Sequence, residues 1–424
     1  MRGVRILRIS AASVASHRGN RLVSTVTADS RRRILAVNSG SSSLKVGVFG
    51  IEPELLETGS IVADGIASGS GRLRADGSLR SIGRSDADLP THEAAITLVL
   101  DALERPGLSG TVAAIGHRVV HGGRRYSAAW HRVDQAMIDE LNRLAPLAPE
   151  HLPQAITAIT AFQASFRDVP HIACFDTAFH HTLSPLARQY PLPQLPETSE
   201  IVRFGFHGLS CESVLDELRR IDPALAERRI VIAHLGNGAS MTAVRDGHSV
   251  ETTMGFTPTG GLMMGTRTGD LDPGVLLYLL SEQGMSPDRL RLLVNKRSGL
   301  KGVSGLTSEM RDLLERAPID PDASNAIDLY CYLARKQLGA LIAVLGGIDV
   351  LVFTGGIGER AAAVRSGVCS GLEFAGIALD ETRNADNAAI ISADDASAIV
   401  RVTPTDEDRM IARHTLSALQ GGVS

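Results

Sequence analysis

The chain has 424 residues and a formal net charge of −4, with 44% apolar and 21% charged residues. These values are typical of a globular protein of about two domains, and the charge argues against a general nucleic-acid or membrane-surface binder. No apolar run approaches the roughly 18 residues that cross a bilayer, so we expect a cytoplasmic protein without a membrane partner.

Residues 1–33 differ from the rest of the chain. They are rich in arginine, serine and alanine, and Asp29 is their one acidic residue. This composition resembles a transit peptide. The alternatives are a disordered tail and a start codon assigned too far upstream, and we favour these because nothing before Ile34 has the pattern of a packed element.

The first predicted element is a hairpin over Ile34–Phe49. The apolar run Ile34–Val37 leads into a loop of small polar and glycine residues, Asn38–Ser43, and an alternating apolar strand follows. Such a loop can point several N–H groups and hydroxyls at a phosphate, with Lys45 as a nearby cation. An ordinary Ser/Gly turn is the alternative.

This plan recurs twice. Arg229–Val244 contains an apolar strand, the loop Gly236–Ser240 and a second strand. Ile348–Arg360 places a strand before Thr354–Gly358, and we expect a helix to open at Glu359. The repetition indicates an internal duplication, so we predict an α/β protein with two similar halves and a cleft between them.

Other elements and the cysteines complete the outline. Apolar spacing predicts helices over Thr91–Leu103, Asp134–Leu144, Gln154–Ser165, Ser210–Ile221, Pro273–Leu280 and Ile327–Leu345. Strands are expected over Thr111–Val120 and His171–Phe175. Four cysteines lack metal-ligand spacing, which favours buried free thiols in a reducing compartment: Cys174, Cys211, Cys331 and Cys369.

Four residues suggest transfer chemistry on an anion. Arg118 and Arg267 lie in glycine-bounded segments, His207 lies in Gly-Phe-His-Gly, and Asp176 follows a strand. If the acceptor is a carboxylate, arginine forks and a histidine donor would reduce its repulsion from a phosphate. A carboxylate needs no base at neutral pH, so alignment and charge stabilisation suffice. Taken singly, the same residues suit a surface ion pair, a helix cap and a structural histidine.

Seven motifs occur together in one order. They are Asn38–Lys45, Gly116–Gly123, Phe175–His180, Gly205–Gly208, His234–Gly238, Gly265–Pro273 and Phe353–Glu359. Together they closely resemble the acetate kinase family, within the acetate and sugar kinase/Hsp70/actin superfamily. The resemblance extends from about Ile34 to about Ala412.

The resemblance implies a duplicated ribonuclease-H-like (actin-like ATPase) fold of two lobes. The expected domains are 34–180, completed by a C-terminal helix at 405–420, and the nucleotide-binding domain 181–404. ATP or ADP and Mg²⁺ (or Mn²⁺) would bind in the cleft, and acetate or another short-chain carboxylate would accept the phosphoryl group by direct in-line transfer. The resemblance also implies a homodimer.

The resemblance also implies residue roles. Asn38 and Glu407 would hold the metal, and catalysis would depend on Asp176, His207 and Arg267. The acid would be bound by Arg118, Val120, Phe206 and Pro258. ATP would be bound by Lys45, His234, Leu235, Gly236, Asn237, Gly238, Glu309, Met310, Arg311, Gly356, Ile357, Gly358, Glu359 and Arg360.

Several positions depart from the family pattern, among them Leu209 and Cys211, which stand where Thr and His are common. Glu309-Met310-Arg311 stands where Asp-Phe-Arg is common. The aromatic residue is missing, so the packing against the base or ribose can differ and the motif does not fix which nucleotide is preferred. Glu150-His151 stands where Leu-His is usual, and a carboxylate there should weaken acetate binding unless it turns outward or pairs with a cation.

One alternative is a propionate or other short-chain acyl kinase. Another is a non-catalytic ATPase clamp of the same superfamily, which would share the glycine loops but would not need Arg118, His207 and Arg267 together.

Overall fold

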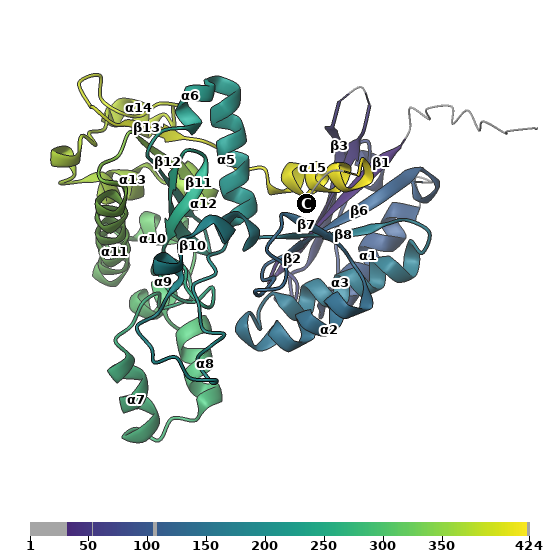
Figure 1. The fold of residues 1–424 in the computed structure, drawn as a ribbon, viewed down its shortest axis with the longest axis horizontal. Helices are drawn as coiled ribbons and strands as arrows, with labels where there is room; N and C mark the ends of the chain where they lie inside the picture. The colour runs from purple at the N-terminus through teal and green to yellow at the C-terminus, as the bar shows by residue number, and fades with distance from the viewer. Residues whose placement is uncertain (1–31, 53, 105–107, 422–424) are drawn as a thin grey trace, which may run out of the picture.

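The computed structural model describes residues 32–52, 54–104 and 108–421. It has two lobes, each built on one β-sheet (Figure 1). The prediction for residues 1–33 falls almost wholly outside the described residues. The proposed division into 34–180 and 181–404 stays a prediction, while the two sheets themselves occupy Arg33–Phe175 and Ile230–Val402.

The first sheet has eight strands, with β1 between antiparallel β2 and parallel β6. In spatial order they are β5 (Arg84–Asp86), β4 (Arg72–Gly77), β3 (Leu56–Asp64), β2 (Ser43–Gly50), β1 (Arg33–Ser39), β6 (Val112–Val119), β8 (His171–Phe175) and β7 (Trp130–Arg132). The apolar run of β1 is buried on both faces, as expected for a central strand covered on two sides.

The second sheet repeats the central topology of the first. Its strands lie in the order β11 (His248–Thr252), β10 (Ala239–Arg245), β9 (Ile230–Leu235), β12 (Val350–Thr354) and β13 (Ile399–Val402). Three antiparallel strands are followed by parallel β12 and β13, just as β3, β2 and β1 are followed by parallel β6 and β8. The expected α/β fold with duplicated halves is therefore confirmed.

The helices cover both sheets. They are α1 (His92–Glu104), α2 (Gln135–Leu144), α3 (Leu152–Ser165), α4 (Pro185–Arg188), α5 (Gly208–Ile221), α6 (Pro223–Ala226), α7 (Pro273–Ser281), α8 (Pro287–Lys296), α9 (Gly299–Ser304), α10 (Met310–Arg316), α11 (Pro321–Leu345), α12 (Gly355–Arg360), α13 (Ala362–Cys369), α14 (Glu381–Ala385) and α15 (Glu407–Leu419). Short 3-10 helices are η1 (Arg80–Ile82), η2 (Ser109–Thr111), η3 (Ala145–Leu147), η4 (Ala178–Thr182) and η5 (Glu373–Ala375). Within the described ranges, no helix combines the length and apolar character that a membrane span requires.

Two helix starts differ from the sequence prediction by four residues or more, and the others differ by two residues at most. The helix expected to open at Glu359 begins at Gly355, because the Glu359 carboxylate accepts a hydrogen bond from Gly355 N at 3.0 Å and so closes the first turn rather than starting it. The helix expected from Ile327 begins at Pro321, where the Asp320 side chain accepts from two backbone N–H groups.

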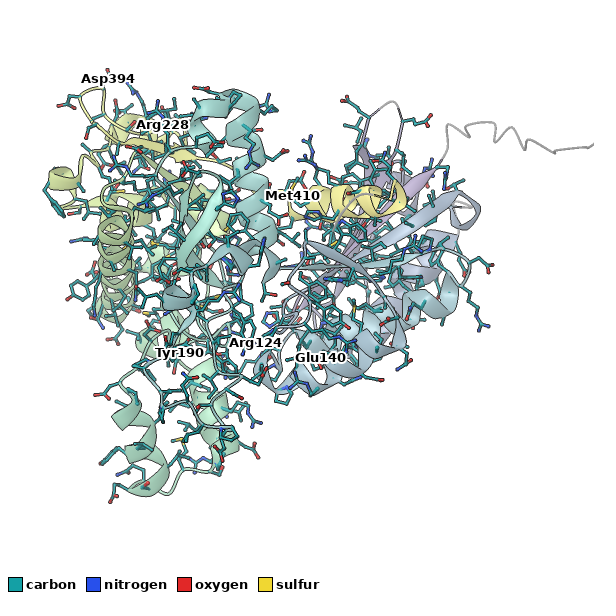
Figure 2. All side chains as sticks on the ribbon, viewed as in Figure 1. Arg124, Glu140, Tyr190, Arg228, Asp394 and Met410 are labelled. Atoms are coloured by element: carbon teal, nitrogen blue, oxygen red, sulfur yellow. The ribbon has the colours of Figure 1, made fainter. Side chains whose placement is uncertain are left out.

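The C-terminal helix α15 returns to the first lobe, where it lies against β1 and β6 (Figure 1). Met410, labelled in Figure 2, and Ile411 are buried in one cluster with Ile34 and Ala36 of β1. The approach is close at Gly116 of β6, where a Cβ atom would lie 2.6 Å from Ile411 Cγ2 and would overlap Thr415 Oγ1. Glycine is therefore needed at this contact.

We expect Gly116→Ala to lower the free energy of unfolding by about 1–3 kcal/mol, because the added methyl group overpacks the α15 contact. The matched control is Gly339→Ala in α11, where a Cβ would meet no atom within 4 Å. Replacing this helical glycine by alanine should stabilise the protein by about 0.5–1 kcal/mol. Urea denaturation at fixed protein concentration measures both, and equal effects of the two substitutions would contradict the packing argument.

Candidate active site

Arg118 and Asp176 form an ion pair at the carboxyl ends of two parallel strands. Arg118 is the next-to-last residue of β6, and Asp176 directly follows the neighbouring strand β8. Arg118 Nη2 donates to Asp176 Oδ2 at 2.7 Å, and Arg118 Nε lies 3.1 Å from the same oxygen. Asp176 is fully buried, so the guanidinium supplies the countercharge that a carboxylate needs away from water.

Asn38 and Glu407 bring the two ends of the described chain to the same guanidinium. Asn38, near the end of β1, accepts from Arg118 Nη1 through Oδ1 at 3.2 Å. Glu407, the first residue of α15, places Oε2 3.1 Å from that Nη1 and also accepts from Asn38 Nδ2 at 3.2 Å. The predicted metal ligands, acid-binding arginine and essential aspartate therefore lie in one cluster.

Lys45 and Asp408 extend this cluster. Lys45 Nζ lies 2.5 Å from Asp408 Oδ2. Three carboxylates, including Asp176 and Glu407, thus face two cations, Lys45 and Arg118. The excess of one negative charge suits a bound divalent cation.

Burial and ion pairing act in opposite directions on these groups. Burial raises the pKa of Asp176 to about 6, although Arg118 draws it down. Burial also disfavours the charged form of Glu407, but Arg118 and His234 outweigh it and lower the pKa of Glu407. Burial raises the pKa of Asp408 against the pull of Lys45. The cluster therefore holds its charges only because cations and carboxylates compensate each other.

His207 and His234 stack face to face, with ring centroids 4.2 Å apart. His207 Nδ1 lies 2.9 Å from Ser240 Oγ, and His234 Nδ1 lies 2.8 Å from Ser210 Oγ. Burial, followed by the mutual effect of the histidines and by Arg118, lowers the pKa of His207 well below its ordinary value, and burial lowers that of His234 to about 4. Both rings are therefore neutral near pH 7.

Arg267 lies near the His207 ring. Its Nη1 donates to Pro258 O at 3.1 Å, and its Nη2 lies 3.4 Å from His151 Nε2. A methyl group on Gly238 would lie 3.3 Å from His207 Nε2 and 3.6 Å from Arg267 Nη1, so the glycine loop runs beside both groups. The polar partners of the Arg267 side chain are the carbonyl of Pro258, the thioether of Met264 and the imidazole of His151. Within the described residues, therefore, no ion pair neutralises Arg267.

A cavity of about 660 Å³ lies on the other side of the glycine loop. It is lined by Gly236, Asn237, Ser308, Glu309, Met310, Arg311, Leu314, Glu315, Gly356, Ile357, Arg360 and Ala361. It thus gathers most of the residues predicted to bind nucleotide. Gly358 and Glu359 lie outside its wall: Gly358 O accepts from Arg365, and Glu359 caps α12. Leu235 is buried in the core of the second lobe.

A smaller cavity of about 240 Å³ lies between the lobes on the Arg267 side. It is lined by Pro146, Leu147, Ala148, Pro149, Glu150, His151, Thr257, Pro258, Thr259, Arg267, Arg291, Val294 and Asn295. Of the residues predicted to bind the acid, Pro258 is on this wall. Val120, which follows β6 of the first sheet, and Phe206 belong to the buried cluster that includes the core of the second lobe, and Phe206 packs edge-on against His121.

Sequence reasoning missed three groups in these contacts. Ser240 and Ser210 orient the two histidines, and Asp408 pairs with Lys45. The serines gave no signal, since each partner lies far away in the sequence. Asp408 could have been found, because it directly follows Glu407 at a predicted helix start and continues an acidic run.

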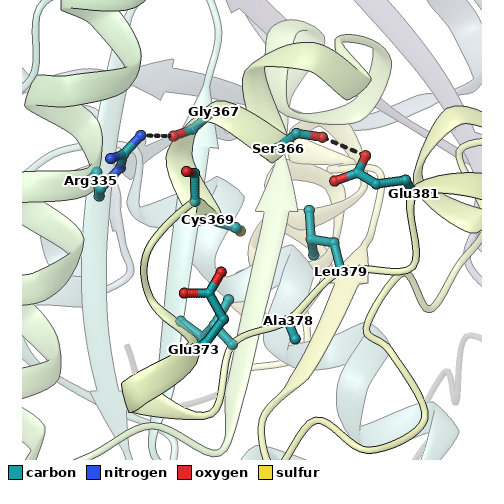
Figure 3. Close-up of a pocket in the computed structure, with 10 residues that line it drawn as sticks. Arg335, Ser366, Gly367, Cys369, Glu373, Ala378, Leu379 and Glu381 are labelled. Atoms are coloured by element: carbon teal, nitrogen blue, oxygen red, sulfur yellow. Dashed lines mark hydrogen bonds between the residues drawn. The ribbon is translucent and has the colours of Figure 1, made fainter.

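A separate cleft of about 520 Å³ lies in the second lobe beside α11 and α13 (Figure 3). Arg335 Nη2 donates to Gly367 O at 2.6 Å, and Ser366 Oγ donates to Glu381 Oε2 at 2.7 Å on its walls (Figure 3). Its lining residues include none of the predicted site residues, so it is not the site described above.

Comparison with known proteins gives matches to one family over most of the chain. The model of the Acetokinase family matches residues 33–413. An acetate kinase from Nitrobacter hamburgensis is 42% identical over 397 residues, covering 91% of this chain and 96% of the relative. A propionate kinase from Citrobacter rodentium is 42% identical over 391 residues, with 91% and 96% coverage.

A solved structure shares the fold. The crystal structure of Porphyromonas gingivalis acetate kinase matches with a TM-score of 0.80 and 33% sequence identity, covering 92% of this chain and all of that one. The match confirms the predicted two-lobed, actin-like arrangement.

We expect the free energy of unfolding to fall as the pH drops from about 6.5 to about 4. Burial lowers the pKa of His121 and His180 to about 4, and that of His117 further. In this pH range the histidines bind protons in the unfolded chain but stay neutral in the folded chain. Each such histidine lowers the free energy of unfolding by about 1.4 kcal/mol per pH unit. The raised pKa values of Asp176 and Asp408 act in the opposite direction, and Asp176 offsets about one histidine. Urea denaturation at several pH values measures the slope, and a flat profile would contradict it.

Proposed function

Because this chain belongs to the acetokinase family, we propose that it transfers the γ-phosphoryl group of ATP reversibly to acetate, giving acetyl phosphate and ADP. The observation that carries the proposal is the placement of the glycine loop 236–238. One side of the loop faces the cavity for the nucleotide, and the other faces His207 and Arg267. A terminal phosphate bound along this loop would therefore meet these two groups.

The residues support a direct in-line transfer. An acetate oxygen forms a bond to the γ-phosphorus while the bond to the β,γ-bridging oxygen breaks, and ADP leaves with that electron pair. Acetate is already ionised, so no base is needed. Arg118 and Arg267 would lower the repulsion between the two anions, and Asp176 would hold the Arg118 fork in place.

His207 would act as a neutral hydrogen-bond donor. If the Ser240 hydroxyl donates to Nδ1, the ring proton is on Nε2. Nε2 is the atom that lies beside Gly238 of the glycine loop, so its N–H is available to a phosphoryl oxygen. A neutral imidazole fits this role because it stabilises developing charge without transferring a proton.

Asn38 and Glu407 fit a magnesium site. An amide oxygen, a carboxylate and an excess negative charge are suitable for a hard cation. In the described part of the chain, no group of three or more His, Cys, Asp and Glu side chains is arranged to hold a metal. We therefore infer that phosphate and water complete the coordination, as Mg²⁺ prefers; Mn²⁺ would serve as well. When bound, the metal supplies positive charge beside the phosphates.

The acid is held in the smaller cavity in this proposal. The relative from Citrobacter rodentium is named a propionate kinase, and one methylene changes discrimination by only about 1–3 kcal/mol. Acetate is the first choice and propionate the second. Met310, in place of an aromatic residue, would pack against the nucleotide base with a more adaptable surface.

We also propose that the protein works as a cytoplasmic homodimer. Each residue of α7 is exposed or half-buried although the helix is strongly apolar, with Leu277 63% and Tyr278 54% exposed. Such a surface is typical of an interface between subunits. The cysteines within the described residues are free and buried, which supports a reducing compartment.

The direct test is formation of acyl phosphate, trapped as hydroxamate, with ATP and Mg²⁺ over formate, acetate, propionate and butyrate. We expect product from acetate and propionate, with kcat/KM values that differ by about 5–150-fold, as one methylene allows. ATP hydrolysis without hydroxamate would contradict the proposed function.

We expect Arg118→Ala to raise the KM for the acid by at least about 30-fold while the KM for ATP changes little. Arg118 lies outside the nucleotide cavity, and its positive charge acts on His151, which lines the smaller cavity and whose pKa is lowered by burial and then by Arg267 and Arg118. Arg311→Ala is the matched comparison: Arg311 is on the nucleotide cavity wall, so the KM for ATP should rise and that for the acid should not. Equal losses in both substrates for Arg118→Ala would show that its role is wrong.

We expect Leu277→Asp to dissociate the homodimer, because a charge in an apolar interface is left unsolvated. Ile319→Asp is the control, since Ile319 is 89% exposed but lies alone before α11. Sedimentation velocity measures the result. A Leu277→Asp protein that sediments like the wild type would reject α7 as the interface.

A further inference from the structure

An ion pair joins the two lobes beside the acid cavity. Glu150 follows η3 in the first lobe, and its carboxylate contacts the ammonium group of Lys296, the last residue of α8 in the second lobe. We propose that Lys296 is a positioning residue that holds the Glu150 carboxylate away from Arg267, and so keeps Arg267 free to bind the acid substrate. The inference rests on the proposed function and concerns the affinity of that site for its acid.

Glu150 brings a negative charge to the acid cavity. It lines the same cavity as Arg267, and the described residues give Arg267 a carbonyl, a thioether and an imidazole as polar partners rather than a carboxylate. Burial lowers the pKa of Arg267, and the Glu150 charge already acts against this effect by raising it, so without its lysine partner the Glu150 carboxylate would be drawn toward this guanidinium. It would then either pair with Arg267 or repel the incoming carboxylate, and both lower acid affinity.

Lys296 belongs to the segment that holds the Arg267 loop. The last turns of α8 hold the loop that carries Arg267: Thr268 N donates to Val294 O at 3.0 Å, and Thr266 Oγ donates to Asn295 O at 2.8 Å. Lys296 follows these two residues directly. The ion pair and Arg267 are thus attached to one short segment, so Lys296 fixes where the Glu150 charge lies relative to Arg267.

Neither the other nearby cation nor a purely structural role accounts for the Glu150–Lys296 pair. Arg291 also lines the cavity, but it pairs with Asp288 at 3.1 Å and is 61% exposed. The Glu150 and Lys296 side chains are 29% and 43% exposed, and pairs this open to solvent contribute little to stability. The effect we infer is therefore the placement of charge.

The test is a double-mutant cycle on the full-length protein with Lys296→Gln, Glu150→Gln and both together. We expect Lys296→Gln to raise the KM for acetate about tenfold, as one uncompensated charge a few ångströms away would do, with no change in the KM for ATP. Glu150→Gln should lower the KM for acetate slightly. The double variant should return to within about threefold of the wild type, because without the carboxylate the lysine has nothing to hold.

Lys336→Gln, an exposed lysine of α11, is the control for the loss of one positive charge from the second lobe. A double variant as impaired as Lys296→Gln alone, or equal rises in the KM values for acetate and ATP, would overturn the inference. Should Lys296→Gln fail to fold, a KM for acetate that rises in Glu150→Gln would overturn it as well.

Calorimetric titration of acetate into the ADP-saturated variants measures the Kd for acetate. The same double-mutant cycle can thus be built from binding affinities, without turnover. A wild type that binds acetate but forms no hydroxamate would reject the proposed function, and the binding cycle would still decide the role of Lys296.

Discussion

The site depends on how one guanidinium is held. Arg118 lies near the end of a central strand of the first sheet. It is fixed by Asp176, which follows the next parallel strand, by Asn38 from β1 and by Glu407 from the C-terminal helix. The last of these contacts requires α15 to lie against β1 and β6, which the absence of a side chain at Gly116 permits. Packing in the first lobe and charge placement in the cleft are thus two consequences of the same helix position.

Charge is divided across the cleft. The Asn38–Glu407 side carries an excess of carboxylate and suits a cation, while the opposite side offers Arg267 without an ion pair and neutral His207. Two anions can approach each other only where such a division exists, because each needs compensation from a different direction. Glu150 is the exception on the Arg267 side, and its pairing with Lys296 restores the division.

Much of this arrangement follows from local sequence. Short-range patterns include the apolar run of β1, the two glycine hairpins and the strand-end positions of Arg118 and Asp176. The order of these motifs along the chain was enough to predict the chemistry of the site. The start of α12 did not follow, because it depends on a cap from Glu359. The Ser240 contact to His207, the Asp408 contact to Lys45 and the Lys296 contact to Glu150 link residues distant in the chain, and no single-sequence pattern encodes such contacts.

The central claim is that Arg118, His207 and Arg267 converge on the phosphoryl group in transit. A crystal structure with ADP, Mg²⁺, aluminium fluoride and acetate tests it most directly. We predict that His207 Nε2 and both guanidinium groups lie within about 2.7–3.2 Å of the fluorides or of the acetate oxygens. A complex in which the aluminium fluoride lies along the glycine loop but the three side chains remain beyond hydrogen-bond reach would contradict the account.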